Sequence, residues 1–364
     1  MGFTCGIVGL PNVGKSTIFN ALAAAQVPAS SYPFCTIDCN KGMVPVPDER
    51  LYKIAEIVHP PQITPTHIQF LDIAGLVKGA SQGEGLGNQF LGHIRTVDAI
   101  VHVVRCFEQP DVSHMYGSLD PRRDVDIVST ELILADLETV EKRMGKVEKL
   151  LRVGDKQAEA EMGVCQKVKT TLEAGNPVRT LDWDEDERAI MTEFFLLTTR
   201  PVIYVANVDE KELQKRNYSA VLEQIAEKEK TGCVVICGDM ESEIALLEDE
   251  EARKEFMADL GLSESGLNQL VTVGYRTLNL ITFYTTVGPE LRAWTVLDGT
   301  RAPQAAGKIH SDMEQGFIKA EVISYNDFIK AGSLAVVKEE GHLRLEGKEY
   351  TIKDGDIVQF KFST

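Results

Sequence analysis

The chain has 364 residues, of which 43% are hydrophobic and 26% are charged, and its formal net charge is −17. This length suits about two or three domains with buried cores, and the acidic balance argues against a surface coated for nucleic-acid binding. No apolar run approaches the ~18 residues of a membrane span, and the first residues lack a secretory signal. Seven scattered cysteines without a Cys-x-x-Cys pair fit reduced thiols. We therefore expect a cytoplasmic protein with no membrane partner.

A phosphate-binding loop is predicted near the start of the chain. Residues 9–17 read Gly-Leu-Pro-Asn-Val-Gly-Lys-Ser-Thr, which matches the spacing G-x-x-x-x-G-K-[ST]. The apolar run Thr4–Val8 before it predicts a buried strand, and a good helix former follows. Backbone N–H groups of such a loop converge on an anion, and the helix dipole favours negative charge. Lys15 is a candidate catalytic residue that pairs with the β- and γ-phosphates, and the Ser16 hydroxyl is placed to bind Mg²⁺. The predicted nucleotide-binding residues of this loop are Asn12, Val13, Gly14, Lys15, Ser16 and Thr17.

Three later residues complete the predicted phosphate site. Asp72 follows the candidate strand His67–Leu71, where its carboxylate can hold Mg²⁺ through water. Gly75 can offer its N–H to a γ-phosphate. Thr36 lies in a loop where its hydroxyl can complete the Mg²⁺ shell once a triphosphate is bound. The predicted metal ligands are thus Ser16, Thr36 and Asp72.

The stretch after Gly75 predicts a switch that works without the usual catalytic glutamine. Residues 79–87 contain four glycines, which is typical of a mobile segment that a γ-phosphate orders. A Ras-type enzyme has a glutamine directly after Asp-x-x-Gly to orient the attacking water. This chain has Leu76 there. Because an alkyl chain cannot orient water, either another group does so or hydrolysis is slow.

The middle of the chain predicts a helical insertion in an α/β domain. The first ~125 residues, which include a third candidate strand at 99–105, alternate apolar runs with helical segments and so indicate a parallel sheet. Apolar residues then recur at heptad spacing from Ile133 to Leu151, which predicts one long helix. After a break at 153–155 a second helical stretch follows, and the two should form an antiparallel hairpin. Candidate strands resume at 201–206 and 233–236, so the hairpin interrupts the sheet.

The hairpin is locally basic although the chain is acidic. Between Val140 and Thr170 there are eight basic and five acidic residues. Such a cluster can contact RNA, or it can be a solvated helix surface.

The C-terminal part predicts a small, mostly β domain. Candidate strands lie at 292–296, 316–323, 343–345 and 357–362, with turn signals at Glu346-Gly347 and Asp354-Gly355. We expect residues 1–128 and 200–278 to form the α/β domain, 129–199 the helical insertion, and 279–364 the β domain.

The predicted base-reading loop favours ATP. GTPases use Asn-Lys-x-Asp, in which the Asp carboxylate accepts two hydrogen bonds from guanine; residues 207–210 read Asn-Val-Asp-Glu. Val208 removes the stacking lysine, Glu210 occupies the carboxylate position, and Asp209 is one residue out of register. Losing the bidentate carboxylate leaves two guanine donors unpaired, whereas adenine has no such donor pair. We expect Asn207, Val208 and Glu210 to face the base, with ATP or relaxed choice over strict GTP.

These motifs resemble a known family. The loop at 9–17, Asp-Ile-Ala-Gly-Leu at 72–76 and the glycine-rich stretch at 79–87 resemble the Obg group of translation-factor-class GTPases. Within that group the Asn-x-x-Glu loop, the helical insertion and the β C-terminal domain are similar to the YchF/Obg-like ATPase family over essentially the whole chain. The resemblance implies a P-loop G domain with a coiled-coil insertion and a β-grasp-like TGS domain. It also implies ATP hydrolysis with Mg²⁺ and association with the ribosome and its RNA.

The resemblance also suggests roles for single residues. In this family a hydrophobic residue replaces the catalytic glutamine, and a histidine in a loop is proposed to substitute; the matching residue here is His114. Asn12 resembles the asparagine of potassium-stimulated members, which adds K⁺ as a candidate cofactor. Gly238-Asp239-Met240 departs from the small-residue pair usual in the last base-side loop.

The sequence leaves three functional hypotheses open. The first is a switch that binds MgATP in preference to GTP, hydrolyses it slowly to ADP and phosphate, and couples nucleotide state to ribosome or RNA contact. The second is an Obg-type GTPase in which Glu210 substitutes for the missing aspartate. The third is a nucleotide-gated binding module with incidental hydrolysis. In each case we expect a monomer with no DNA partner.

Overall fold

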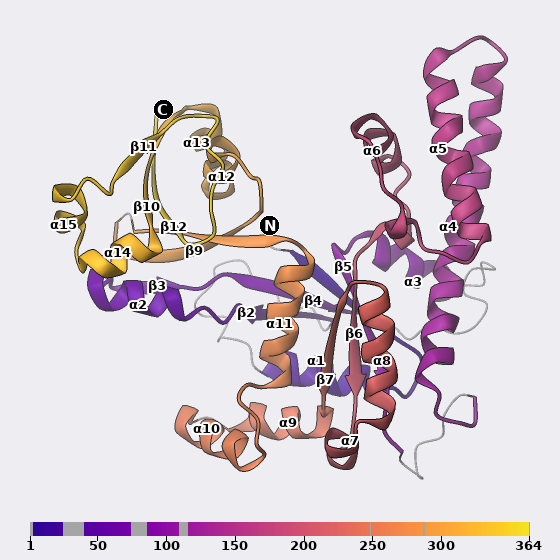
Figure 1. Ribbon diagram of the computed structural model, residues 1–364, viewed down its shortest axis with the longest axis horizontal. Helices are drawn as coiled ribbons and strands as arrows, with labels where there is room; N and C mark the ends of the chain where they lie inside the picture. The colour runs from indigo at the N-terminus through magenta and orange to yellow at the C-terminus, as the bar shows by residue number, and fades with distance from the viewer. Residues whose placement is uncertain are drawn as a thin grey trace. The chain divides into compact units, whose positions relative to one another are not determined.

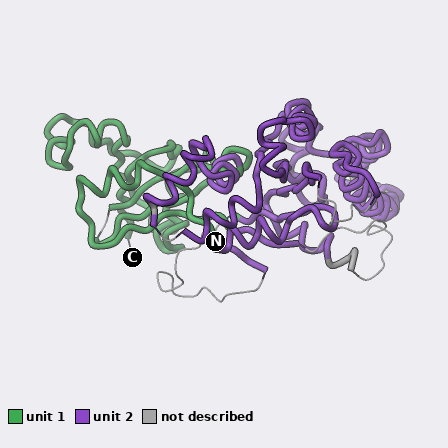
Figure 2. The backbone as a smooth tube through the Cα atoms, turned by 90° about the horizontal axis from the view of Figure 1, so that it is seen from below, with its two compact units in different colours: residues 1–3, 43–69, 274–364 green, residues 4–42, 70–273 purple. Residues whose placement is uncertain are grey.

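The protein divides into two compact units. The computed structural model describes residues 3–24, 40–73, 86–108, 116–247, 249–286 and 288–363 (Figure 1). The first unit combines residues 1–3, 43–69 and 274–364, and the second combines residues 4–42 and 70–273 (Figure 2). None of the described helices is long and apolar enough to cross a membrane.

A six-stranded sheet with the order β2-β4-β1-β5-β6-β7 carries the predicted phosphate-binding loop. The pairs β1–β5, β5–β6 and β6–β7 are parallel. Every residue of β5 and β6 is buried, as expected for central strands covered on both faces. The five strands predicted in this region are confirmed to within one residue at each end. The strands are β1 (Thr4–Val8), β2 (Lys41–Pro45), β4 (His67–Asp72), β5 (Ala99–Arg105), β6 (Val202–Asn207) and β7 (Gly232–Ile236).

Helices connect these strands and pack on the sheet. The helix α1 follows the phosphate-binding loop and contacts α9, which follows β7. Their bounds are α1 (Lys15–Ala24), α3 (Leu86–Arg95), α7 (Glu210–Lys215), α8 (Asn217–Lys228), α9 (Gly238–Leu246), α10 (Glu250–Asp259) and α11 (Gly266–Thr277).

The predicted helical hairpin is confirmed. The helices α4 (Pro121–Leu151) and α5 (Lys156–Glu173) lie side by side and are joined by a short turn (Figure 1). Two apolar clusters line the seam between them, and every residue of the predicted heptad pattern belongs to one of these clusters. Because β5 and β6 are neighbours in the sheet, the hairpin is an insertion between them. The chain returns to β6 through η3 (Val178–Thr180), α6 (Glu185–Thr192) and η4 (Leu197–Thr199).

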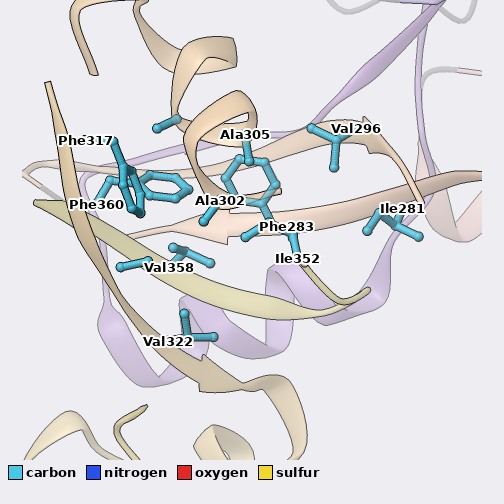
Figure 3. Close-up of a cluster of buried hydrophobic side chains, with 12 residues drawn as sticks. Ile281, Phe283, Val296, Ala302, Ala305, Phe317, Val322, Ile352, Val358 and Phe360 are labelled. Carbon is cyan, nitrogen blue, oxygen red and sulfur yellow. The ribbon is translucent and has the colours of Figure 1, made fainter. Parts of the chain in front are cut away.

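The first unit is built on a mixed sheet with the order β11-β10-β12-β8-β9-β3. One face packs on α12 and α13, where the Phe360 ring meets Phe283 and Phe317 edge-on (Figure 3). The other face packs on α2, α14 and α15. The strands are β3 (Gln62–Thr64), β8 (Leu280–Thr285), β9 (Glu290–Leu297), β10 (Phe317–Ser324), β11 (Arg344–Glu346) and β12 (Asp356–Phe362). The helices are α2 (Glu49–Val58), α12 (Ala302–Ile309), α13 (Ser311–Gln315), α14 (Tyr325–Ala331) and α15 (Leu334–Glu339).

An early segment belongs to this C-terminal unit. The sequence-based division placed residues 43–69 in the α/β domain. In the structure the contact-based first unit includes these residues, although β2 and β4 at the two ends of the segment still pair in the α/β sheet. The strand β3 pairs with β9 in parallel, and α2 buries Leu51 and Ile54 in the core of the second face. The Arg50 guanidinium donates to the Asp354 carboxylate at 2.7 Å. The apolar face of α2 packs on this sheet. No local sequence pattern predicts a packing partner so distant in the chain.

Candidate nucleotide-binding site

The loop between β1 and α1 depends on its glycines. Gly14 has a φ of +89°, and a Cβ there would lie 2.0 Å from Nδ2 of Asn207. A Cβ on Gly9 would lie 2.4 Å from the backbone oxygen of Val103. Asn12 is also left-handed, with a φ of 61°, a conformation that asparagine adopts more readily than most residues. The spacing of the motif therefore reflects close backbone approach at two glycines and a tight turn between them.

Lys15 is a buried cation held by backbone oxygens. Its side chain is 8% exposed, and Nζ donates to the carbonyls of Gly9 at 3.0 Å and Leu10 at 2.7 Å. Burial lowers the pKa of Lys15 to about 8, while the charge of Asp72 acts in the opposite direction. Among the described residues no carboxylate forms an ion pair with Lys15. A buried charge without an ionic partner is costly, so this loop is suited to an anionic ligand.

Two of the three predicted metal ligands lie at this end of the sheet. Asp72 ends β4. Burial raises the pKa of its carboxyl group above the ordinary value, and the charge of Lys15 offsets only part of this. Ser16 is exposed in the first turn of α1. Carboxylate and hydroxyl oxygens are the ligand types that Mg²⁺ takes in proteins, so these two residues fit that ion. Thr36, Gly75 and His114 lie outside the described residues.

Asn207 joins two loops of the site. Its side chain is buried; Nδ2 donates to the Val13 carbonyl at 2.9 Å, and Oδ1 accepts from the Gly238 N–H at 3.2 Å. The sequence placed this side chain toward the base, whereas the structure uses both of its polar atoms to connect the phosphate-binding loop to the start of α9. Asparagine carries a donor and an acceptor on one group, which this bridge requires. The only sequence signal was its position directly after a buried strand.

The rest of the Asn-x-x-Glu loop is also engaged with the fold. The N–H of Val208 donates to the Ile236 carbonyl at 2.9 Å. Asp209, which the sequence places one residue out of register, is the N-cap of α7: its Oδ1 accepts from the Glu212 N–H at 2.8 Å. Glu210 is the exposed first residue of that helix. Glu210 is therefore the carboxylate of this loop that the fold leaves on the surface.

Sequence reasoning missed several buried polar groups behind the site. His102 lies in β5, and burial lowers its pKa to about 3, with the charges of Lys15 and Arg179 acting in the same direction. Its ring lies 5.7 Å from that of Tyr204, whose hydroxyl donates to Glu229 at 3.1 Å. Arg179 of η3 donates to the same carboxylate at 2.9 Å. These polar residues extend from β5 to η3, which follows the hairpin. The sequence signal for them was His102, a histidine inside an apolar strand.

Comparison with known proteins covers the whole chain. A family model described as a 50S ribosome-binding GTPase matches residues 4–151, and a model for the C-terminal domain of YchF GTPases, described as a protein of unknown function, matches residues 280–363. The chain is 50% identical to the ribosome-binding ATPase YchF of Pasteurella multocida and 48% identical to that of Bacillus subtilis, with 100% of each chain covered. The structure of the Schizosaccharomyces pombe YchF GTPase is similar with a TM-score of 0.90 and 36% identity, covering 99% of this chain and 98% of that one.

Proposed function

Because the chain belongs to the YchF family of P-loop nucleotide hydrolases, we propose that it is a ribosome-associated ATPase that binds ATP in preference to GTP and hydrolyses it slowly to ADP and phosphate. The observation that carries the ATP preference is the engagement of Asp209. Its carboxylate caps α7 through the Glu212 N–H, so it is committed to the helix rather than to a base.

The remaining loop residues support the same preference. A guanine base needs a carboxylate that accepts from two of its donors, and losing one leaves those donors unpaired. The Asn207 amide is occupied by Val13 and Gly238, and the Val208 N–H is occupied by Ile236. Glu210 is then the remaining candidate at the base edge. Since adenine presents an acceptor where guanine presents a donor, ATP avoids this cost.

The hydrolysis site is proposed from the loop and strand ends. Lys15 and the backbone N–H groups of residues 12–17 would bind the β- and γ-phosphates and stabilise negative charge as the terminal phosphoryl group leaves. Ser16, Thr36 and Asp72 would hold Mg²⁺, which supplies charge neutralisation at the phosphates when bound. Gly75 would donate its N–H to the γ-phosphate.

Turnover is proposed to be slow because the usual glutamine is replaced by Leu76. We assign water positioning to His114, and we assign K⁺ binding to Asn12, whose left-handed backbone turns the loop beside the phosphates.

The partner surfaces are proposed to lie outside the nucleotide loops. The hairpin and the C-terminal domain would contact the ribosome and its RNA in a cytoplasmic, monomeric protein that binds ATP, with GTP weaker and no DNA partner. We propose residues 1–128 and 200–278 as the G domain, 129–199 as the insertion and 279–364 as the TGS domain. Within the first range, α2 and β3 belong to the compact unit that contains the TGS domain.

A combined turnover and binding assay tests this function. Phosphate release would be measured with ATP and GTP, and co-sedimentation with purified bacterial 70S ribosomes would be measured with ATP, ADP and no nucleotide. We expect ATP turnover, loss of that turnover in Lys15→Ala, and ribosome binding that depends on the nucleotide. The exposed Lys211→Ala serves as a matched control. Ribosome binding that is identical with ATP, with ADP and in Lys15→Ala would instead favour a binding module with incidental hydrolysis.

A further inference from the structure

Seven of the eight basic residues of the hairpin between Val140 and Thr170 have side chains that the structure describes, and these seven fall into two groups. One group is paired with carboxylates, which neutralise its charge locally. The pairs are Lys142–Glu138 at 2.5 Å, Arg143–Glu161, Lys167–Glu187 at 2.7 Å and Lys169–Glu141 at 2.9 Å. The other group consists of Lys146, Lys149 and Arg152, which form no ion pair among the described residues. Glu148 stands four residues before Arg152 and does not pair with it either.

The unpaired cations lie at the far end of α4, with Lys146 and Lys149 in its last turns and Arg152 as the C-cap residue directly after Leu151. The three positions are three residues apart, and residues three or four apart are neighbours on a helix surface. All three side chains are exposed, whereas Val147 and Leu151 between them point into the seam with α5. The cations therefore stand on the side of α4 that faces away from the partner helix.

A glycine on this face has no close contact and no backbone conformation that requires glycine. Gly145 lies inside α4, is exposed, and would place a Cβ with nothing within 4 Å. Its φ is not in the left-handed range that favours glycine. A glycine in a helix interior is less stable than alanine there, so this residue costs stability without a contact that requires it. It leaves bare backbone next to Lys146 and one turn before Lys149, which lets a ligand approach closely.

We infer that Gly145, Lys146, Lys149 and Arg152, here named the distal cationic face, bind the phosphate backbone of RNA. This inference rests on the proposed ribosome association and names the chemistry of its partner. On a protein with a net charge of −17, three adjacent unpaired cations attract a polyanion. RNA fits better than an acidic protein, since lysine is depleted in protein–protein interfaces while lysine and arginine contacts to phosphate dominate nucleic-acid binding.

Two triple variants of the full chain separate the unpaired cations from the paired ones. K146Q/K149Q/R152Q removes the distal cations, and K142Q/K167Q/K169Q removes the same charge from paired positions. Binding to purified bacterial 70S ribosomes and to protein-free ribosomal RNA would be measured between 50 and 200 mM KCl. For the distal triple we expect at least tenfold weaker binding and a log–log salt slope about two units shallower. The control triple should bind within threefold of wild type, with ATP turnover and melting temperature unchanged in the distal triple.

A second pair of variants tests the bare backbone. Gly163 is an exposed glycine inside α5 that also has open space around its Cβ position. Gly145→Ala and Gly163→Ala should both raise the melting temperature, but only Gly145→Ala should weaken RNA binding, by about threefold or more. A purely structural role for Gly145 would leave RNA binding equal in the two variants.

The outcomes distinguish failure of the proposed ribosome association from failure of the RNA-binding role of the distal cationic face. Wild-type protein that binds neither ribosomes nor RNA overturns the proposed association together with this inference. Wild-type binding that both triples retain overturns the inference alone. Weakened ribosome binding by the distal triple, with no wild-type affinity for protein-free RNA, shows an acidic protein partner and also overturns the RNA assignment.

Discussion

Two of the buried charges in the second unit, Lys15 and Asp136, are stabilised in opposite ways. Lys15, in the phosphate-binding loop, is 8% exposed and donates to two carbonyl oxygens. Asp136, on α4 at the base of the hairpin, is fully buried. Its carboxylate accepts from the N–H groups of Leu197 and Thr198, each at 2.8 Å, and from the Thr198 hydroxyl at 2.7 Å.

The difference separates a binding site from a structural joint. Burial raises the pKa of Asp136, and its three donors counteract this, so the fold itself stabilises the charge and fixes α4 to η4. Burial lowers the pKa of Lys15 to about 8, and no described carboxylate pairs with it. The donors around Asp136 stabilise its negative charge within the fold, whereas the positive charge of Lys15 is left to pair with a ligand. Substitutions at the two places should therefore act on different observables.

The largest effect on ATP affinity is expected from Gly14→Ala. Its Cβ would overlap Nδ2 of Asn207 at 2.0 Å and would require a left-handed alanine. ATP affinity measured by calorimetry should fall at least ~100-fold, about 3 kcal/mol, because the strain of a left-handed alanine adds to the loss of the Asn207 bridge. Gly117→Ala is the control, since Gly117 has a φ of +77° but open space. Equal losses of ATP affinity in both variants would show a general loss of folded protein rather than an effect local to the phosphate-binding loop.

Asp136→Ala should lower stability and spare the nucleotide site. Three buried donors would lose their acceptor, which costs about 3–4 kcal/mol of unfolding free energy. Urea denaturation would measure this loss, and ATP affinity should stay within twofold. The exposed Asp126→Ala on the same helix should change stability by less than about 0.5 kcal/mol. Reduced ATP affinity in folded Asp136→Ala protein would contradict the separation of joint from site.

Lys15 should leave a pH signature in the ligand-free protein. Its pKa is about 8 in the folded state, compared with the ordinary value of 10.5 expected for the unfolded chain. Between pH 8 and pH 10.5 the unfolded chain therefore binds more protons than the folded one. The cost of burying the charge is fully present below pH 8 and is relieved as pH rises toward 10.5. Relative to Lys15→Met, wild-type unfolding free energy should rise by up to about 3 kcal/mol across this window. A flat difference would show that Lys15 is not destabilised by burial.

The smallest effect is expected from Asn207→Ala. The carbonyl of Val13 and the N–H of Gly238 would lose their bridging amide, which costs about 1–2 kcal/mol. ATP and GTP affinities should fall together, each by about tenfold, because the lost contacts hold the loops rather than the base. A loss confined to one nucleotide would show that Asn207 reads the base directly.

Local patterns made part of this site predictable from the sequence. The phosphate-binding loop is a contiguous motif, and the hairpin seam from Ile133 to Leu151 follows one repeat, so both were predicted correctly. The roles of Asn207 and Asp136 depend on partners about 194 and 62 residues away, which no local pattern encodes. The sequence analysis did not predict strand β8, which follows α11 after a turn at Asn279, whose φ is 52°.

The recruitment of residues 43–69 was unpredictable for the same reason. The apolar face of an amphipathic helix such as α2 predicts that the helix packs on another element, but its sequence does not identify which sheet that is. Here the partner is formed by strands more than two hundred residues later in the chain.

A competition titration of ATP against GTP on the Mg²⁺-loaded full-length protein bears most directly on the proposed function. Asp209 is committed to capping α7, and the Asn207 and Val208 polar groups are committed to neighbouring loops, so ATP should bind more tightly than GTP. GTP binding more than about tenfold tighter than ATP, about 1.4 kcal/mol, would contradict the ATPase assignment and identify Glu210 as a working guanine reader.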